Sequence, residues 1–231
     1  MINNKNLKSR ALKINKEIYK NNLSILNFGD ASVIDKNRSK IYIKASGIGE
    51  DKCKLSNIVE VKIKNFNSKN HYKIKPSVDT VVHIELYKHL KNVGCIIHSH
   101  SEFSTILSQA NIEPKCFGTT HADYFNGPIP MSTKIVKVDN KKYEFQIAKS
   151  IIQRLKKYKQ NVPGILLRDH GVFAWGKNET EAIHNLIAIE YICKLYFKTK
   201  MIVKNPKISK SLKSFHFLRK NGKSKYYGQN N

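Results

Sequence analysis

The sequence predicts a single α/β domain. Its 231 residues are enough for one substantial hydrophobic core and short for two. Hydrophobic residues make up 40% of the chain, and segments with a helical spacing of apolar residues alternate with short apolar runs typical of strands. We expect one domain over residues 1–231, without an interdomain linker or an internal repeat.

The first part of the chain predicts one helix followed by paired strands. Apolar residues recur every three or four positions between Leu7 and Ile18, which indicates an amphipathic helix ending near Asn21. Alternating apolar residues predict strands over 31–35, 39–44 and 59–63. The polar turn 36–38 joins the first two strands into a hairpin, and a polar turn over 65–70 precedes a further short strand.

The rest of the chain continues the alternation of helices and strands. The expected elements are a helix 79–90, a strand 95–98, a helix 103–109, a polar loop 112–130, a helix 144–158, strands 164–167 and 172–175, and a helix 179–198. The segment from Lys204 onward is very basic, yet its aromatic residues make it more apolar than solvated tails usually are.

The charge balance is strongly basic but does not predict a nucleic-acid partner. Lys and Arg number 42 against 17 Asp and Glu, which gives a formal net charge of +25. Nucleic-acid binding needs cations gathered on one face, whereas these lysines are spread over nearly every segment. We expect no nucleic-acid partner, although the positive field would help to bind an anionic substrate.

Cysteine usage and hydropathy indicate the compartment. None of the four cysteines forms a C-x-x-C pair, which predicts reduced thiols and no disulfide framework. They are Cys53, Cys95, Cys116 and Cys193. The amino terminus lacks the apolar stretch of a secretory signal, and no apolar run approaches the roughly 18 residues that span a membrane. We expect a cytoplasmic protein with no membrane partner.

Two histidines two residues apart are the strongest sign of a functional site. His98 and His100 lie at the end of an apolar strand, where side chains at positions i and i+2 point to the same face. Neutral imidazole is the commonest protein ligand for zinc-like metals. The pair predicts part of a divalent-metal site, with Asp79 and His170 as candidate further ligands. The alternative is a pair of hydrogen-bonded structural histidines.

Five motifs in one order resemble a known family. They are Lys75-Pro76-Ser77-Val78-Asp79-Thr80, Ile97-His98-Ser99-His100-Ser101, Gly118-Thr119-Thr120-His121-Ala122-Asp123-Tyr124-Phe125, Asp169-His170-Gly171-Val172-Phe173-Ala174-Trp175-Gly176-Lys177 and Lys225-Tyr226-Tyr227-Gly228-Gln229. From about Leu7 to Gln229 the chain resembles the L-ribulose-5-phosphate 4-epimerases, a group within the class II aldolase and adducin-head family. The resemblance implies a largely antiparallel central sheet flanked by helices.

The resemblance also implies a complete metal site. Its ligands would be Asp79, His98, His100 and His170. One carboxylate and three imidazoles suit Zn²⁺, with Mn²⁺ or Co²⁺ as substitutes. Considered alone, Asp79 fits equally well as the N-cap of the helix that follows it.

A pocket for the substrate phosphate is implied as well. The matching positions are Gly29, Asp30, Lys44, Ser46, Gly47, Ser77 and Val78. Glycines expose backbone N–H groups, hydroxyls donate hydrogen bonds and Lys44 supplies charge. Asp30 stands where the family has Asn, and Val78 where it has Ser. We expect the extra carboxylate and the lost hydroxyl to weaken phosphate binding. Without this context, Ser46 and Gly47 would indicate only a turn.

The family's acid and base positions match Asp123 and Tyr227. The implied reaction epimerises C4 of L-ribulose 5-phosphate to give D-xylulose 5-phosphate, by opening the C3–C4 bond and closing it on the other face of the aldehyde. Proton transfer on two faces needs two groups. Supporting positions are His216, Arg219, Thr119, His121 and Glu144. The resemblance implies a homotetramer in which residues from about 204 to 231 reach a neighbouring subunit's site.

Two other functions stay open. An aldolase of the same family would release its aldehyde product, but such aldolases tend to have Glu at the position of Asp79. A non-catalytic binding module is possible in principle because the adducin head uses this fold as a scaffold. The remaining histidines fit no partner pattern and are assigned no role; they are His71, His83, His89 and His184.

Overall fold

Six short apolar segments pair into one antiparallel sheet. The computed structural model describes residues 4–49, 52–64, 66, 72–158, 161–222 and 225–226. Within them the strand order is β3-β2-β1-β4-β6-β5. The strands are β1 (Asp30–Ile34), β2 (Lys40–Lys44), β3 (Ile58–Lys62), β4 (Cys95–Ser99), β5 (Gly164–Leu167) and β6 (Gly171–Gly176). All neighbouring strands are antiparallel, which confirms the expected sheet.

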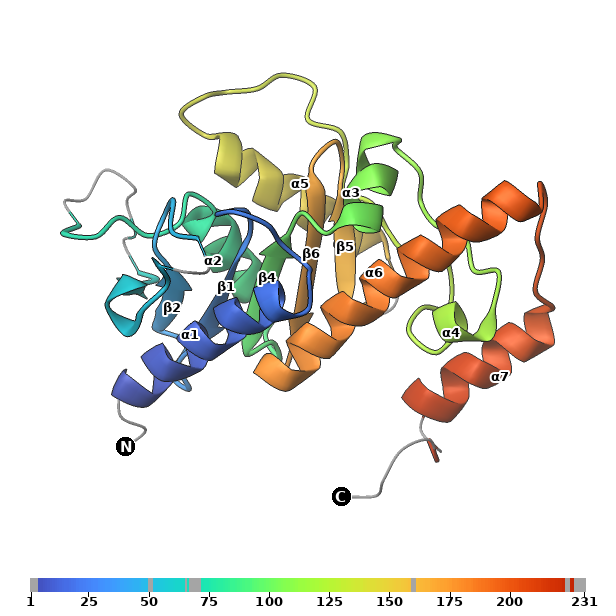
Figure 1. Cartoon of the computed structure of the whole chain (residues 1–231), viewed down its shortest axis with the longest axis horizontal. Helices are drawn as coiled ribbons and strands as arrows, with labels where there is room; N and C mark the ends of the chain where they lie inside the picture. Colours follow the sequence, from blue (N-terminus) through green and yellow to red (C-terminus); the bar gives the residue numbers. More distant parts are fainter. Residues whose placement is uncertain are drawn as a thin grey trace.

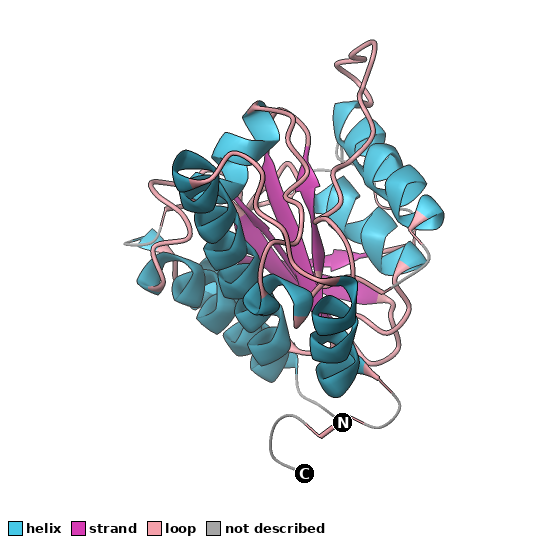
Figure 2. Ribbon diagram, turned by 90° about the vertical axis from the view of Figure 1, so that its right-hand side faces the viewer, coloured by secondary structure: helices cyan, strands magenta, loops and turns pink. Residues whose placement is uncertain are grey.

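Helices cover both faces of this sheet. They are α1 (Asn4–Lys20), α2 (Thr80–His89), α3 (Glu102–Gln109), α4 (Thr119–Ala122), α5 (Tyr143–Lys157), α6 (Glu179–Ile202) and α7 (Lys210–Asn221), with a short 3-10 turn over Leu55–Asn57. Figure 1 shows α1 and α6 crossing one face, with α2 and α5 behind the strands. Figure 2 shows the strands enclosed between the two groups of helices. One core of buried residues joins both layers, so the domain is a single α/β unit.

The β1–β2 hairpin forms where the sequence predicts it, because a side chain closes its turn. Oδ1 of Asp35 accepts hydrogen bonds from the backbone N–H groups of Ser39 (2.7 Å) and Lys40 (2.9 Å). Asx side chains commonly close turns in this way. Most other predicted elements are present, with ends shifted by one or two residues.

Two helices differ from the prediction. The one-turn helix α4 lies inside the segment expected to be a loop, and α7 forms in the basic segment after Lys204. Helix α6 extends to Ile202, four residues beyond the expected end. The short strand expected after 65–70 is reduced, among the described residues, to a bridge between Pro76 and Ala45. Residues 65 and 67–71 lie outside the described part of the chain.

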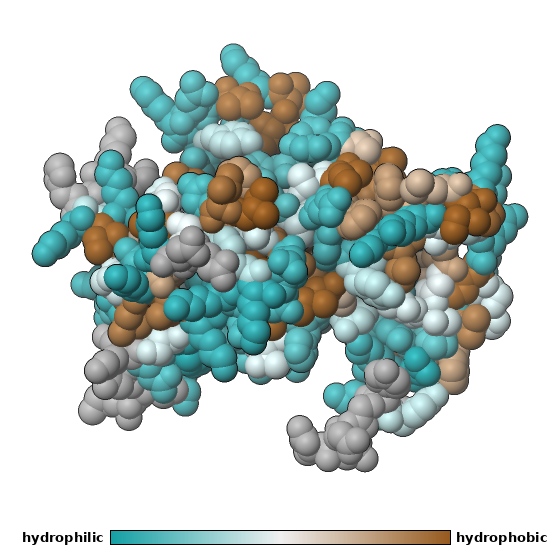
Figure 3. Space-filling view, viewed as in Figure 1, coloured by the Kyte–Doolittle hydropathy of each residue, from teal (hydrophilic) through white to brown (hydrophobic). Residues whose placement is uncertain are grey.

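The end of the domain that carries α7 exposes apolar side chains. Figure 3 shows them at the right, near the carboxyl end of α6. Exposed apolar residues of α6 and α7 and of the segment between them are Met201, Ile202, Val203, Leu212, Phe215 and Leu218. No residue of α7 is buried, so this helix lies on the surface of the single chain.

Candidate functional site

Three histidines converge at one end of the sheet. Strand β4 carries His98 and leads to His100, and β6 begins directly after His170. Because Ser99 pairs with Val172, the end of β4 lies opposite the start of β6. Nε2 of His98 lies 3.1 Å from Nε2 of His100 and 3.2 Å from Nε2 of His170. The ligand atoms of all three lie within 4.8 Å of one another.

The histidines are held in the form that binds metals. Nδ1 of His98 lies 3.1 Å from the carbonyl oxygen of Val172. A carbonyl only accepts, so the proton is on Nδ1 and the Nε2 lone pair faces the cluster. Burial, together with His170, lowers the pKa of His98 to about 3. Burial also lowers the pKa of His170 to about 4 and lowers that of His100. Neutral imidazoles facing one another suit a shared cation.

A strained turn presents His170. Asp169 has φ of +61°, a left-handed conformation that non-glycine residues adopt infrequently. Its N–H donates to the carbonyl oxygen of Ser108 (3.1 Å), and its Oδ1 accepts from Nδ2 of Asn111 (2.9 Å). The residue after His170 is Gly171, where an added Cβ would lie 2.5 Å from the carbonyl oxygen of Ser99. The end of α3 therefore fixes the turn before β6.

Asp79 shares a cavity with the three histidines. It is the N-cap residue of α2, as the sequence predicts, but its side chain makes no capping hydrogen bond. Burial raises the pKa of Asp79 well above its usual range, and the charges of Asp30 and Glu144 act in the same direction. A nearby cation would oppose both effects.

The cavity has a volume of about 260 Å³ and contains every residue predicted to bind substrate. These are Gly29, Asp30, Lys44, Ser46, Gly47, Ser77 and Val78. Glu144 also lines it, together with five residues that the sequence interpretation missed: Asn27, Phe28, Ala45, Tyr143 and Ile147. Most of the missed residues are direct chain neighbours of predicted ones, which is the signal that could have found them.

Two glycines shape the cavity wall. Gly29 has φ of +69° and Gly47 has φ of +72°, both in the left-handed region. A Cβ on Gly29 would lie 2.6 Å from the carbonyl oxygen of His98. Glycine therefore brings the loop before β1 against the strand that carries the histidines. No atom lies within 4 Å of a Cβ added to Gly47, so there the backbone angle is the only constraint.

Lys44 is the buried cation of the cavity. It is 2% exposed. Its Nζ donates to the hydroxyl of Tyr19 (3.1 Å) and the carbonyl oxygen of Asn27 (3.3 Å). Burial lowers the pKa of Lys44, while the charge of Asp30 acts in the opposite direction. Both hydrogen-bond partners orient the ammonium group at the cavity wall.

Asp30 differs from the sequence expectation, in which its carboxylate stands beside the substrate phosphate. Burial alone would raise the pKa of Asp30, but His83 and other neighbours lower it to about 2. Its Oδ1 lies 2.9 Å from Nε2 of His83, and its Oδ2 accepts from Oγ of Ser77. In this structure the Ser77 hydroxyl donates to Asp30, although Ser77 lines the cavity, and its contact with a phosphate stays a prediction. His83, which was assigned no role, is the other partner of Asp30.

The predicted acid position lies in a second cluster. Oδ1 of Asp123 lies 3.1 Å from Nδ1 of His216 and 3.4 Å from a guanidinium nitrogen of Arg219. Helix α7 supplies both of these side chains, and Asp123 ends α4. None of these three residues lines the cavity. Figure 1 shows α4 beside α7, away from the histidine-bearing strands. Tyr227 lies outside the described residues.

Two supporting positions also lie in α4. Thr119 begins this helix, and Nε2 of His121 lies 2.8 Å from the carbonyl oxygen of Gly127. Neither residue lines the cavity that contains the histidines. Within the described chain, three of the four predicted metal ligands lie within 4.8 Å of one another, and Asp79 and the predicted substrate positions line the same cavity. The predicted acid and its neighbours lie elsewhere.

The antiparallel sheet with three histidines at its end can be compared with known protein families. Residues 9–197 match the family described as "Class II Aldolase and Adducin N-terminal domain". The chain belongs to this family.

Solved structures show the same fold. An L-fuculose 1-phosphate aldolase is 22% identical with a TM-score of 0.75, over 91% of this chain and 93% of that chain. The L-fuculose-1-phosphate aldolase from Thermus thermophilus is 20% identical with a TM-score of 0.63, over 85% and 95%. A sugar-phosphate aldolase from Thermotoga maritima is 17% identical with a TM-score of 0.63, over 87% and 97%. Among the described residues, no helix is long and apolar enough to span a membrane.

Proposed function

We propose that the protein is a metal-dependent enzyme that breaks and forms a carbon–carbon bond in a sugar phosphate. The observation that carries this proposal is the group of three neutral imidazoles, with ligand atoms within 4.8 Å, in one cavity with Asp79 and buried Lys44. A retro-aldol step needs a Lewis acid for the developing negative charge and a cation for the phosphate.

His98, His100 and His170 would hold the metal, with Asp79 as the fourth ligand. Three imidazoles and one carboxylate favour Zn²⁺, and Mn²⁺ or Co²⁺ would be accepted. When bound, the ion would act as a Lewis acid on the substrate oxygens next to the bond that breaks.

The phosphate would bind at the wall formed by Lys44 and the two left-handed glycines. Lys44 supplies positive charge, and the loops around Gly29 and Gly47 offer backbone N–H groups. Ser46 offers a hydroxyl, and Val78 and Asp30 complete the wall. In this arrangement the phosphate is held in place while the other end of the sugar lies at the histidines.

For the reaction itself we favour 4-epimerisation of L-ribulose 5-phosphate to D-xylulose 5-phosphate. Asp123 and Tyr227 would transfer protons on the two faces of the aldehyde. Because Asp123 does not line the cavity of its own chain, we propose that it serves the cavity of another copy. His216 and Arg219 would hold its carboxylate in place, with Thr119 and Glu144 in support. A homotetramer with sites between subunits fits this arrangement, in which residues from about 204 to 231 contact the neighbour.

An aldolase is the second candidate. The similar structures reported above include two L-fuculose-1-phosphate aldolases, and an aldolase would use the same histidines and the same phosphate wall. The acidic side chain at position 79 is Asp, which favours the epimerase in the comparison with family motifs. A non-catalytic module is third, because it would not need four potential ligands in one cavity. A cytoplasmic location and the absence of a nucleic-acid partner stay predictions from the sequence.

Product analysis separates these candidates. The full-length protein, loaded in turn with Zn²⁺, Mn²⁺ and Co²⁺, is incubated with L-ribulose 5-phosphate and with L-fuculose 1-phosphate. We expect D-xylulose 5-phosphate to form without net release of aldehyde, and the activity to disappear on chelation and return on adding metal. Net aldehyde release would indicate the aldolase, and no stoichiometric metal would contradict the proposal as a whole.

A further inference from the structure

A buried histidine lies behind the cavity wall and contacts Asp30. His83 belongs to α2 and is 0% exposed. Its Nε2 lies 2.9 Å from Oδ1 of Asp30, which is 2% exposed. A carboxylate without a proton only accepts, so Nε2 of His83 must carry the proton in this contact.

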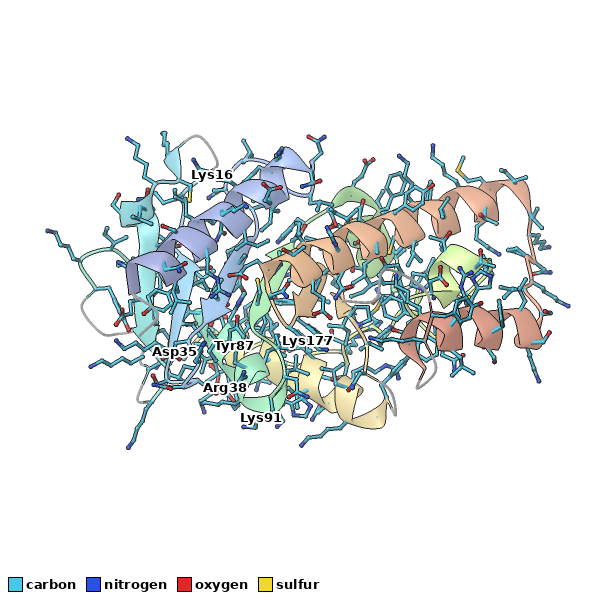
Figure 4. The ribbon with its side chains drawn as sticks, turned by 90° about the horizontal axis from the view of Figure 1, so that it is seen from below. Lys16, Asp35, Arg38, Tyr87, Lys91 and Lys177 are labelled. Atoms are coloured by element: carbon cyan, nitrogen blue, oxygen red, sulfur yellow. The ribbon has the colours of Figure 1, made fainter. Side chains whose placement is uncertain are left out.

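The other imidazole nitrogen of His83, Nδ1, also has a polar partner. Nδ1 lies 2.7 Å from Oγ of Ser32, which in turn contacts the hydroxyl of Tyr87 at 3.1 Å. Tyr87 also donates to the carbonyl oxygen of Ser32 (2.9 Å). The guanidinium carbon of Arg38 lies 5.7 Å from the centre of the Tyr87 ring, and Figure 4 shows these two residues together near α2. Each imidazole nitrogen thus has an oxygen atom within 3 Å, although the Nε2–Oδ1 contact does not have hydrogen-bond geometry.

Asp30 also connects His83 to the loop before α2, through Ser77. Its second oxygen accepts from Oγ of Ser77, and the same Oγ accepts from the backbone N–H of Asp79 (3.2 Å). The backbone N–H of Ser77 donates to the carbonyl oxygen of Lys44 (2.9 Å). The carboxylate therefore connects α2 to the cavity wall. Without a partner for Oδ1, it would be a buried negative charge next to the wall that would hold an anion.

We propose that His83 is a positioning residue that holds the Asp30 carboxylate against Ser77 and gives its Oδ1 a polar partner, so that the Lys44 wall can accept an anionic group. This inference rests on the proposed function, since it concerns the wall that would bind the phosphate. It also explains how the chain tolerates Asp30 in an anion pocket. An ordinary core histidine would fill space without affecting anion binding.

The test measures the dissociation constant of inorganic phosphate by isothermal titration calorimetry on the full-length protein. The variants are His83→Leu, Asp30→Asn and the double variant, with Leu86→Ala as the control for a packing defect in the same helix. His83→Leu keeps a side chain of similar volume but leaves the Asp30 carboxylate unpaired, so we expect affinity to fall by about ten-fold or more. The double variant has the same packing change but lacks the charge, so its affinity should return to within about three-fold of wild type.

Asp30→Asn alone should bind phosphate at least as tightly as wild type, because it removes a negative charge from the wall. Leu86→Ala should bind within about two-fold of wild type, because it leaves no unpaired charge. His83→Gln should keep near wild-type affinity, since its amide can still donate to Asp30. Should His83→Leu fail to fold, His83→Asn replaces it, because the shorter amide does not reach the carboxylate. A double variant as weak as His83→Leu, or a wild type that binds no phosphate, would overturn the inference.

Turnover of sugar phosphate separates this inference from the proposed function. A wild type that binds phosphate with the expected dependence on His83 but converts no sugar phosphate would contradict only the proposed reaction. A wild type that converts sugar phosphate while His83→Leu binds phosphate normally would contradict only the role of His83.

Discussion

The histidine cluster and the Asp123 cluster both bring distant polar residues together, but the protein supports them differently. His98 and His170 are fixed by strands in the middle of the sheet, where β4 pairs with both β1 and β6. Asp123 is fixed by α4 and α7, and α7 has no buried residue while Phe215 is 52% exposed and Leu218 is 55% exposed. The first cluster is complete within one chain, whereas the second lies on a surface that another copy could cover.

The largest expected effect comes from removing the central histidine. His98→Ala should abolish stoichiometric zinc binding and lower turnover by about 10³-fold or more, because Lewis-acid catalysis is worth several kcal/mol. The measurements are bound metal by mass spectrometry and steady-state rates. Undiminished zinc in this variant would show that the three nitrogens do not form the metal site.

A substitution in the Asp123 cluster should lower turnover without changing metal binding. Asp123→Asn should lower turnover by about 10²-fold to 10⁴-fold, the range for loss of a proton-transfer group. Its zinc content should equal that of wild type, because Asp123 does not line the cavity. Reduced zinc in this variant would contradict the separation of the two regions.

Mixing the two variants tests whether different copies complete each other's sites. Co-expressed His98→Ala and Asp123→Asn chains should regain up to about a quarter of wild-type activity, since random assembly of a ring pairs an intact histidine cluster with an intact Asp123 at that frequency. Each variant expressed alone provides the baseline. Activity of the mixture that stays at this baseline would exclude a shared site.

Two glycine substitutions, one next to the histidine cluster and one next to the Asp123 cluster, compare how tightly the backbone is packed in the two regions. Gly171→Ala should lower the free energy of unfolding by about 2 kcal/mol, because its Cβ would lie 2.5 Å from the carbonyl oxygen of Ser99. Gly118→Ala, before α4, should cost less than about 1 kcal/mol, since no atom lies within 4 Å of its Cβ. Urea denaturation measures both, and equal losses would contradict the comparison.

The smallest effect concerns pH. Burial lowers the pKa of His121 to about 4, although its hydrogen bond to Gly127 opposes the shift. The unfolded chain takes up this proton below about pH 6.5, so the free energy of unfolding should fall by at most about 1.4 kcal/mol per pH unit between there and pH 4. Above that range both states are neutral and no contribution remains.

His121→Gln should remove this part of the pH dependence. Urea denaturation at about pH 7.5, 6 and 5 should show a loss of stability on acidification that is smaller than in wild type, by about 1 kcal/mol at pH 6 and about 2 kcal/mol at pH 5. Parallel curves for the two proteins would mean that His121 is not held neutral in the folded state.

The sequence predicted those features that depend on local patterns. Alternation and helical spacing predicted the strands and most helices, and the i, i+2 spacing placed His98 and His100 on one face. Helix α4 was missed because a single turn has no periodicity, and α7 because its many lysines obscure an apolar stripe. His170 lies close to His98 because of the register between β4 and β6, and spacing along the chain does not reveal this register. His170 was predicted as a ligand from the family resemblance.

The pairing of Asp30 with His83 shows what local patterns cannot reveal. The two residues are far apart in the sequence, and only the packing of α2 on β1 brings them within 2.9 Å. From the sequence alone, Asp30 is an unfavourable charge at a phosphate position. In the fold its oxygens are occupied by His83 and Ser77, so the expected penalty depends on a partner that no motif contains.

The place of β4 in the sheet has a consequence for the order in which a newly made chain acquires its metal. His98 and His100 leave the ribosome together and can join β1, which is already present. His170 follows 72 residues after His98, so a nascent chain that ends within α5 has only two of the three imidazoles. On the proposed function, tight metal binding would require β6 to have been translated and added to the sheet, so cofactor loading would depend on completion of the domain.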